Sequence, residues 1–139
     1  MDKEKLSERY VLYQILAQNL ETLKQQLQLV EQQVFELRST LMSMEDIKKL
    51  DEKNEILLPL GSGCYGSGMI TDGKNILVNA GAGVFINEDM GAAKSLLEER
   101  LAEAEKAGKE VQTQAEKIIV QMNEIASEIQ EAARQESES

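Results

Sequence analysis

The chain has 139 residues, enough for one domain, with 25 acidic against 15 basic residues and a formal net charge of −10. This charge repels phosphate backbones and anionic lipid surfaces, which argues against nucleic-acid binding and membrane-surface binding. The lack of histidine excludes imidazole-based catalysis and metal binding, and the single cysteine, Cys64, cannot form an internal disulfide.

The chain starts with Met1-Asp2-Lys3-Glu4 and passes directly into an amphipathic helix instead of an apolar signal segment. No apolar run approaches the roughly 20 residues that span a bilayer. Together with the unpaired cysteine, these features predict a cytoplasmic protein.

Residues 3–50 are predicted to form the first helix, because apolar side chains recur every 3.5 residues. This stripe is one partner helix wide, so the helix must lie along another helix. The polar cluster Asp51-Glu52-Lys53-Asn54 is expected to stop it. The heptad a and d positions are apolar except for Arg9: Leu6, Arg9, Tyr13, Leu16, Leu20, Leu23, Leu27, Val30, Val34, Leu37, Leu41 and Met44.

Residues 55–87 are predicted to form two β-hairpins. Pro59 suits an edge or a bulge, and Asp72-Gly73-Lys74-Asn75 is predicted to be a hairpin turn, since Asp-Gly tolerates positive φ. A second turn is expected at Ala80-Gly81-Ala82-Gly83. The segment Gly61-Ser62-Gly63-Cys64-Tyr65-Gly66 matches a phosphate-binding glycine pattern, but no helix follows it directly. A turn or a bulge is the better interpretation of these glycines.

Hairpins this short have little apolar surface and leave strand edges unpaired. We therefore expect their strands to pair with strands of other subunits; packing on the helix ends of the same chain is the alternative. The strand residues assigned to oligomerisation are Ile56, Leu57, Leu58, Leu60, Met69, Ile70, Ile76, Leu77, Val78, Val84, Phe85 and Ile86.

Residues 89–133 are predicted to form the second helix, capped by Asn87 or Asp89, with residues 134–139 as a frayed tail. Its seam positions carry no charge: Met90, Leu97, Leu101, Ala104, Gly108, Val111, Ala115, Ile118, Met122, Ile125, Ile129 and Ala132.

The two helices could form separate dimers with other chains, but their seams favour an antiparallel hairpin within one chain. If the chain doubles back through the insert, Leu27 and Val30 face Val111 and Gly108, so large side chains meet small ones. A homodimer of the second helix would instead stack glycine on glycine and leave voids.

Some apolar residues lie outside the seams. Around Tyr10 to Leu16 the first helix is apolar nearly all round, so a single partner helix cannot cover it. An exposed apolar patch is expected to bind protein. The alternative is that the coiled coils of neighbouring subunits, or a local folding back of the chain, cover it. Leu29, Phe35 and Met42 are expected to pack on the base of the helix pair or on a neighbouring subunit. The residues assigned to the binding surface are Leu6, Tyr10, Val11, Leu12, Ile15, Ile119, Met122, Ile125 and Ile129, with Val120 beside them.

Two equal coiled-coil segments bracket Leu57-Leu58-Pro59-Leu60-Gly61 and Asn79-Ala80-Gly81-Ala82-Gly83-Val84-Phe85-Ile86, an arrangement that resembles archaeal alpha-type subunits of the prefoldin family. The resemblance covers nearly the whole chain. It implies an α+β fold in which a long antiparallel two-helix coiled coil carries two inserted β-hairpins. It also implies that the strands join an inter-subunit β-barrel, in a hetero-hexamer of two alpha-type and four beta-type subunits.

The resemblance further implies an ATP-independent chaperone subunit, not an enzyme, with no cofactor. Such a subunit captures non-native client proteins at the coiled-coil tips and delivers them to a group II chaperonin. The alternative function is a structural, filament-forming coiled-coil subunit in which strand pairing propagates.

Overall fold

The computed structural model describes residues 2–50 and 54–138. In chain order the elements are helix α1 (Lys3–Lys48), strands β1 (Glu55–Gly61), β2 (Cys64–Met69), β3 (Asn75–Gly81) and β4 (Val84–Asp89), and helix α2 (Met90–Glu138). The prediction of two long helices with two β-hairpins between them is confirmed. Within the chain two compact units are distinguished: a terminal unit, Met1–Gln33 with Ala104–Ser139, and a hairpin unit, Val34–Glu103.

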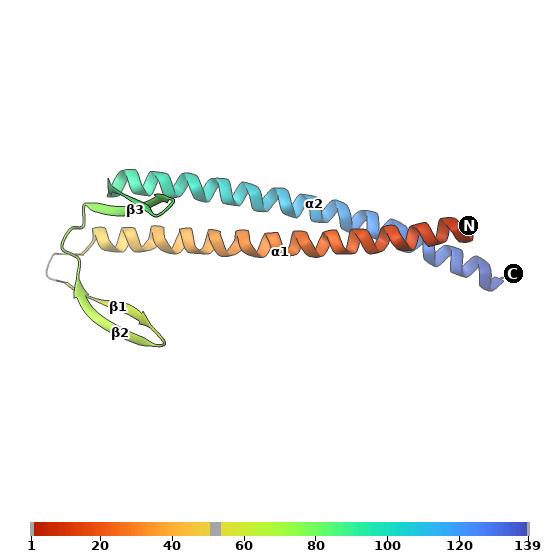
Figure 1. The fold of residues 1–139 in the computed structure, drawn as a ribbon, viewed down its shortest axis with the longest axis horizontal. Helices are drawn as coiled ribbons and strands as arrows, with labels where there is room; N and C mark the ends of the chain where they lie inside the picture. Colours follow the sequence, from red (N-terminus) through yellow and green to blue (C-terminus); the bar gives the residue numbers. More distant parts are fainter. Residues whose placement is uncertain (1, 51–53, 139) are drawn as a thin grey trace. The chain divides into compact units, whose positions relative to one another are not determined.

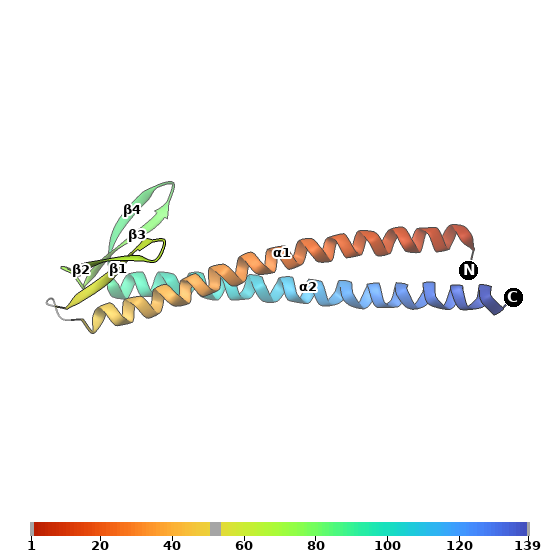
Figure 2. The ribbon, with the colours of Figure 1, turned by 90° about the horizontal axis from the view of Figure 1, so that it is seen from below.

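In the terminal unit, α1 and α2 lie side by side and run in opposite directions (Figures 1 and 2). A Cβ atom added to Gly108 would lie 3.2 Å from Val30 Cγ1 and 4.0 Å from Leu27 Cδ1. Nearer the termini, Arg9 Nε lies 3.1 Å from Glu128 Oε2. The predicted antiparallel register, with Leu27 and Val30 against Gly108, is therefore confirmed.

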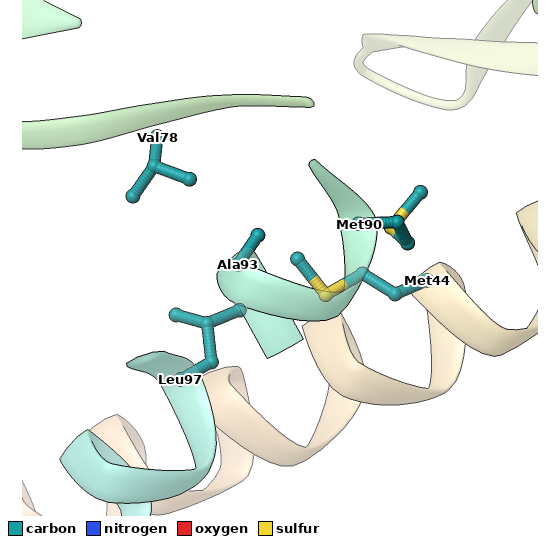
Figure 3. Close-up of a cluster of buried hydrophobic side chains, with 5 residues drawn as sticks. All are labelled: Met44, Val78, Met90, Ala93 and Leu97. Atoms are coloured by element: carbon teal, nitrogen blue, oxygen red, sulfur yellow. The ribbon is translucent and has the colours of Figure 1, made fainter. Parts of the chain in front are cut away.

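In the hairpin unit, a core forms where α1, β3 and the start of α2 meet. Figure 3 shows the side chains of its buried members, Met44, Val78, Met90, Ala93 and Leu97. Ile76 of β3 is partly buried against the same cluster. Ile76 and Val78 thus pack on the helices of their own chain, as the alternative interpretation expected. Pairing of the strand edges with other subunits stays a prediction.

The hairpins are formed by β1 with β2 and by β3 with β4, each pair antiparallel. The register shifts between Pro59 and Gly61 in the first hairpin. Its turn has positive φ angles of 104° at Gly61, 53° at Ser62 and 79° at Gly63. The interpretation of the glycine pattern as a turn or bulge is therefore confirmed, since glycine reaches this region of φ at little cost.

The hairpin turn predicted at Asp72-Gly73-Lys74-Asn75 is wrong, because this segment connects the two hairpins. Asp72 Oδ1 accepts hydrogen bonds from the backbone N–H groups of Lys74 at 2.9 Å and Asn75 at 3.3 Å. The aspartate side chain therefore shapes a loop by itself, as it often does in turns. Strand β2 ends at Met69, so Ile70, a predicted strand residue, lies in this loop.

The start of α2 is fixed by two hydrogen bonds. The N–H of Ala92 donates to Asp89 Oδ1 at 2.8 Å, so Asp89, and not Asn87, caps the helix. The N–H of Met90 donates to the carbonyl oxygen of Lys74 at 2.8 Å. The second bond joins the inter-hairpin loop to the first turn of α2.

Both helices end at other residues than predicted. Helix α1 stops at Lys48 because the N–H of Leu50 donates to the Ile47 carbonyl at 3.1 Å, which closes a tight turn. Asp51, Glu52 and Lys53 of the predicted stop cluster lie outside the described residues. Helix α2 continues to Glu138, so the predicted frayed tail is wrong for residues 134–138. Arginine, glutamine and glutamate favour helices, and no glycine or proline interrupts this segment.

Over the described parts of the chain, neither helix offers a stretch long and apolar enough to cross a membrane.

Candidate binding surfaces

Large apolar side chains are exposed on both helices of the terminal unit. On α1, about half of the Tyr10 surface (52%) and of the Ile15 surface (50%) is exposed. These residues lie outside the a and d rows, so a single partner helix cannot cover them. We call the exposed set the terminal patch: Tyr10, Val11, Leu12 and Ile15 on α1, with Ile119 and Val120 on α2.

The other residues assigned to the binding surface belong to the helix seam. Leu6, Met122 and Ile129 are half-buried and offer only part of their side chains. Ile125 is buried, with 4% of its surface exposed. The assignment of Ile125 to the binding surface is therefore corrected, because a partner cannot reach this side chain while the helices are paired.

An ion pair between Arg9 and Glu128, which the sequence pattern did not predict, lies beside the terminal patch. The two side chains are 43% and 42% exposed, and a pair this exposed contributes on the order of 0–1 kcal/mol. The antiparallel register could have revealed it, since Arg9 is the one charged seam position of α1 and the register brings it close to Glu128. Glu128 thus provides a partner for the guanidinium of Arg9, which lies at a seam position that is otherwise apolar.

The hairpins also expose apolar side chains. Strand pairing places Leu57, Tyr65 and Met69 on one face of β1–β2, and all three are exposed. Leu77 and Phe85 are their exposed counterparts on β3–β4. Tyr65 is absent from the predicted oligomerisation set because the glycines around it obscure the alternation of a strand. Of the other predicted strand residues, Leu58, Leu60, Val84 and Ile86 are exposed, Ile56, Ile70 and Ile76 are half-buried, and Val78 is buried.

Leu29, Phe35 and Met42 are exposed on α1, with 74% of the Phe35 surface accessible. Packing on the base of their own helix pair is therefore wrong for these residues. Contact with a neighbouring subunit stays a prediction.

Charged contacts join the helices of the hairpin unit and shape its loop. Lys94 Nζ donates a hydrogen bond to Glu45 Oε1 at 2.8 Å, linking α2 to α1. This bond, helped by the charges of Lys94 and Lys48, lowers the pKa of Glu45, and the same bond raises the pKa of Lys94. The pKa of Asp72 is lowered chiefly by the hydrogen bond from the Lys74 backbone and then by that from the Asn75 side chain.

Comparisons with known proteins agree on one family. The family model described as "Prefoldin subunit" matches residues 16–135. Prefoldin subunit alpha of Pyrococcus horikoshii is 37% identical to this chain over 139 residues, covering 96% of this chain and 89% of the relative. Prefoldin subunit alpha of Archaeoglobus fulgidus is 29% identical, covering 99% of this chain and 100% of the relative.

A solved structure shares the fold. The cryo-EM structure of filamentous PFD from Methanocaldococcus jannaschii superposes with a TM-score of 0.70 at 16% sequence identity, covering 88% of this chain and 98% of that chain.

Proposed function

The chain belongs to the prefoldin family as an alpha-type subunit, a non-enzymatic coiled-coil chaperone, and from this premise we propose that it holds non-native proteins at its terminal patch. Holding requires no ATP, because it consists of the reversible burial of apolar surface. The clients are polypeptides whose apolar side chains are exposed because they have not folded.

The exposed terminal patch is the observation that carries this proposal. Burial of apolar surface stabilises a complex by roughly 25 cal/mol per Å², so a few side chains on one helix pair bind only weakly. Several subunits acting on the same client raise the effective affinity without any new kind of contact. The formal charge of −10 keeps the remaining surface strongly hydrated and self-repelling.

The assembly that provides several such patches is proposed to contain beta-type subunits, two alpha-type with four beta-type chains. Among the described residues, each sheet has two strands, so every strand keeps one edge that no strand of its own chain pairs. Such edges are suited to pairing with strands of other subunits in a shared β-barrel. The exposed Leu57, Leu77 and Phe85 supply apolar side chains for the barrel interior. Delivery of clients to a group II chaperonin in the cytoplasm rests on family membership.

The test is suppression of client aggregation by the complex assembled with a beta-type subunit. In the variant, Tyr10, Val11, Leu12 and Ile15 are all changed to serine. The control changes Leu29, Phe35 and Met42 to serine; these residues lie on the same helix and are more exposed. Light scattering of a diluted denatured client should rise with the first variant, because its binding surface is lost, and should stay low with the control. Native mass spectrometry verifies that both variants assemble. Full protection by the first variant would refute the assignment of client binding to the terminal patch.

A filament-forming function is the alternative, favoured by the same unpaired strand edges and by the fold shared with the filamentous PFD of Methanocaldococcus jannaschii. Electron microscopy separates the two proposals. Closed particles with projecting coiled coils support the chaperone assembly, and open fibres of this chain support the filament.

A further inference from the structure

The two β-hairpins are two copies of one structural unit. Their residues correspond in sequence: Ile56 with Ile76, Leu57 with Leu77, Leu58 with Val78, Gly61 with Gly81, Gly63 with Gly83 and Tyr65 with Phe85. The register shift falls at the same place in both, before Gly61 and before Gly81. The φ angles of these two glycines are 104° and 106°. The residues that cover one face of β3–β4 therefore indicate what chemistry fits the same face of β1–β2.

In β3–β4, one face is covered by the helices of its own chain. Val78 is only 9% exposed and packs in the cluster formed by Met44 of α1 and by Met90, Ala93 and Leu97 of α2 (Figure 3). Strand β3 thus packs on a pair of antiparallel helices, where the small Ala93 lies between larger apolar side chains.

In β1–β2, the corresponding face is covered only in part by the described residues, with Ile56 half-buried. Leu58, the counterpart of Val78, is 44% exposed, and the neighbouring Leu60 is exposed as well. Strand pairing sets Leu58 opposite Gly66 and Ile56 opposite Gly68, so these residues share one face. Within the part of the chain that the structure describes, Leu58 and Leu60 thus leave much of this apolar face exposed.

The glycines of β2 shape this face for close packing. A Cβ atom added to Gly68 would lie 2.9 Å from Leu58 Cδ1, and one added to Gly66 would lie 3.8 Å from Leu60 Cδ1. The leucines of β1 thus lean across β2 and fill the space that side chains would occupy. In β3–β4 the corresponding positions hold the larger Ile86 and Glu88. On this face β2 contributes no side chain at Gly66 and Gly68, and β1 contributes only apolar side chains. Such a face can pack closely against another element.

We propose that this face of β1–β2, formed by Ile56, Leu58 and Leu60, packs on the helix pair of a neighbouring beta-type subunit, in the way that Val78 packs on the helices of its own chain. The proposal rests on the proposed assembly and adds a second contact to strand pairing. A second copy of this chain is a poor occupant, because the equivalent helix surface is already covered by its own β3. By analogy with the cluster that covers Val78, the helix pair that covers this face needs small and medium apolar side chains at the contact.

The experiment places the photo-activatable residue p-benzoylphenylalanine at position 58 of the full chain, assembled with a beta-type subunit. Position 57 serves as the matched control, because it lies on the opposite face of the same strand. After illumination, mass spectrometry maps the cross-linked peptides. Position 58 should join to helical peptides of the beta-type subunit, and position 57 should not.

Cross-links from position 58 to beta-type strands only, to a second copy of this chain, or to nothing would overturn the proposal. If the bulky residue blocks assembly, Leu58→Cys in a Cys64→Ser chain replaces it, and its thiol should react at least tenfold more slowly in the complex than in the free chain. An unchanged rate would also overturn the proposal. Native mass spectrometry separates the two levels: a complex that forms without covering position 58 refutes this contact alone, and a failure to form any complex refutes the assembly as well.

Discussion

At the residue scale, Gly108 determines how closely α1 and α2 approach in the terminal unit. Glycine within a helix costs about 1 kcal/mol relative to alanine, so its presence in α2 needs a packing reason. That reason is Val30, whose Cγ1 lies 3.2 Å from the point where a Cβ atom would begin. The helices are therefore matched, with branched side chains of α1 filling the space left by a missing side chain on α2.

Gly108→Leu should lower the free energy of unfolding by about 1–3 kcal/mol, because the new side chain cannot enter the seam without displacing α1. Ala107→Leu is the control: its neighbouring position is exposed, and the change in stability should stay within about 0.5 kcal/mol. Thermal unfolding followed by circular dichroism measures both. Equal melting temperatures for the two variants would show that the seam does not close on Gly108.

The size pattern of seam residues was sufficient to predict this register, because steric fit is local and can be read from heptad positions. The burial of Ile125 was predictable for the same reason, since it lies on a seam row. Ile125 was assigned to the binding surface because it lies near the terminal patch, although a seam position predicts burial. Exposure of Tyr10 and Ile15 was predictable from their places outside the seam.

At the scale of elements, the hairpin turns lie at the Gly-x-Gly segments and not at Asp72-Gly73. Asp72-Gly73 reads as a hairpin turn in the sequence, yet Asp72 uses its carboxylate to hold Lys74 and Asn75 in a connecting loop. The true turns lie at the two Gly-x-Gly segments, where Gly61, Gly63, Gly81 and Gly83 all have positive φ. The length of β2 could not be predicted, because its glycines are explained only by the leucines of the facing strand.

The ion pair between Glu45 and Lys94 links α1 and α2 in the hairpin unit, and it predicts a pH dependence. Because the pKa of Glu45 is lowered, its contribution to stability is present above the ordinary value of 4.5 and is lost as the pH falls through the lowered value. Because the pKa of Lys94 is raised, its contribution is present below 10.5 and is lost as the pH rises through the raised value.

Glu45→Gln should therefore lower the melting temperature slightly between these two pH limits and have no effect well below 4.5. The effect is small since the side chains of Lys94 and Glu45 are 35% and 44% exposed and solvent screens the pair. Melting curves of wild type and variant across the acid range provide the measurement. A difference that persists undiminished at strongly acidic pH would contradict this account.

At the scale of the whole molecule, the exposed apolar side chains fall into separate stretches of the sequence. Exposed apolar side chains lie in the terminal patch, which is proposed to hold clients, and in the hairpins, which are proposed to form the assembly, while charged residues cover much of the remaining helix surface. The helices and hairpins could be predicted from heptads and strand alternation within one chain. The proposed partners of the strand edges lie in other subunits, so the residue pattern of this chain alone could not define them.

The central claim is that the terminal patch holds the client, and an environment-sensitive fluorophore tests it most directly. In a Cys64→Ser chain, the dye is attached through Leu12→Cys or, as the control, through Phe35→Cys, both exposed on α1. On addition of a denatured client to the assembled complex, the emission of the dye at position 12 should shift to shorter wavelength, while that at position 35 stays constant. A shift at position 35 with none at position 12 would contradict the account.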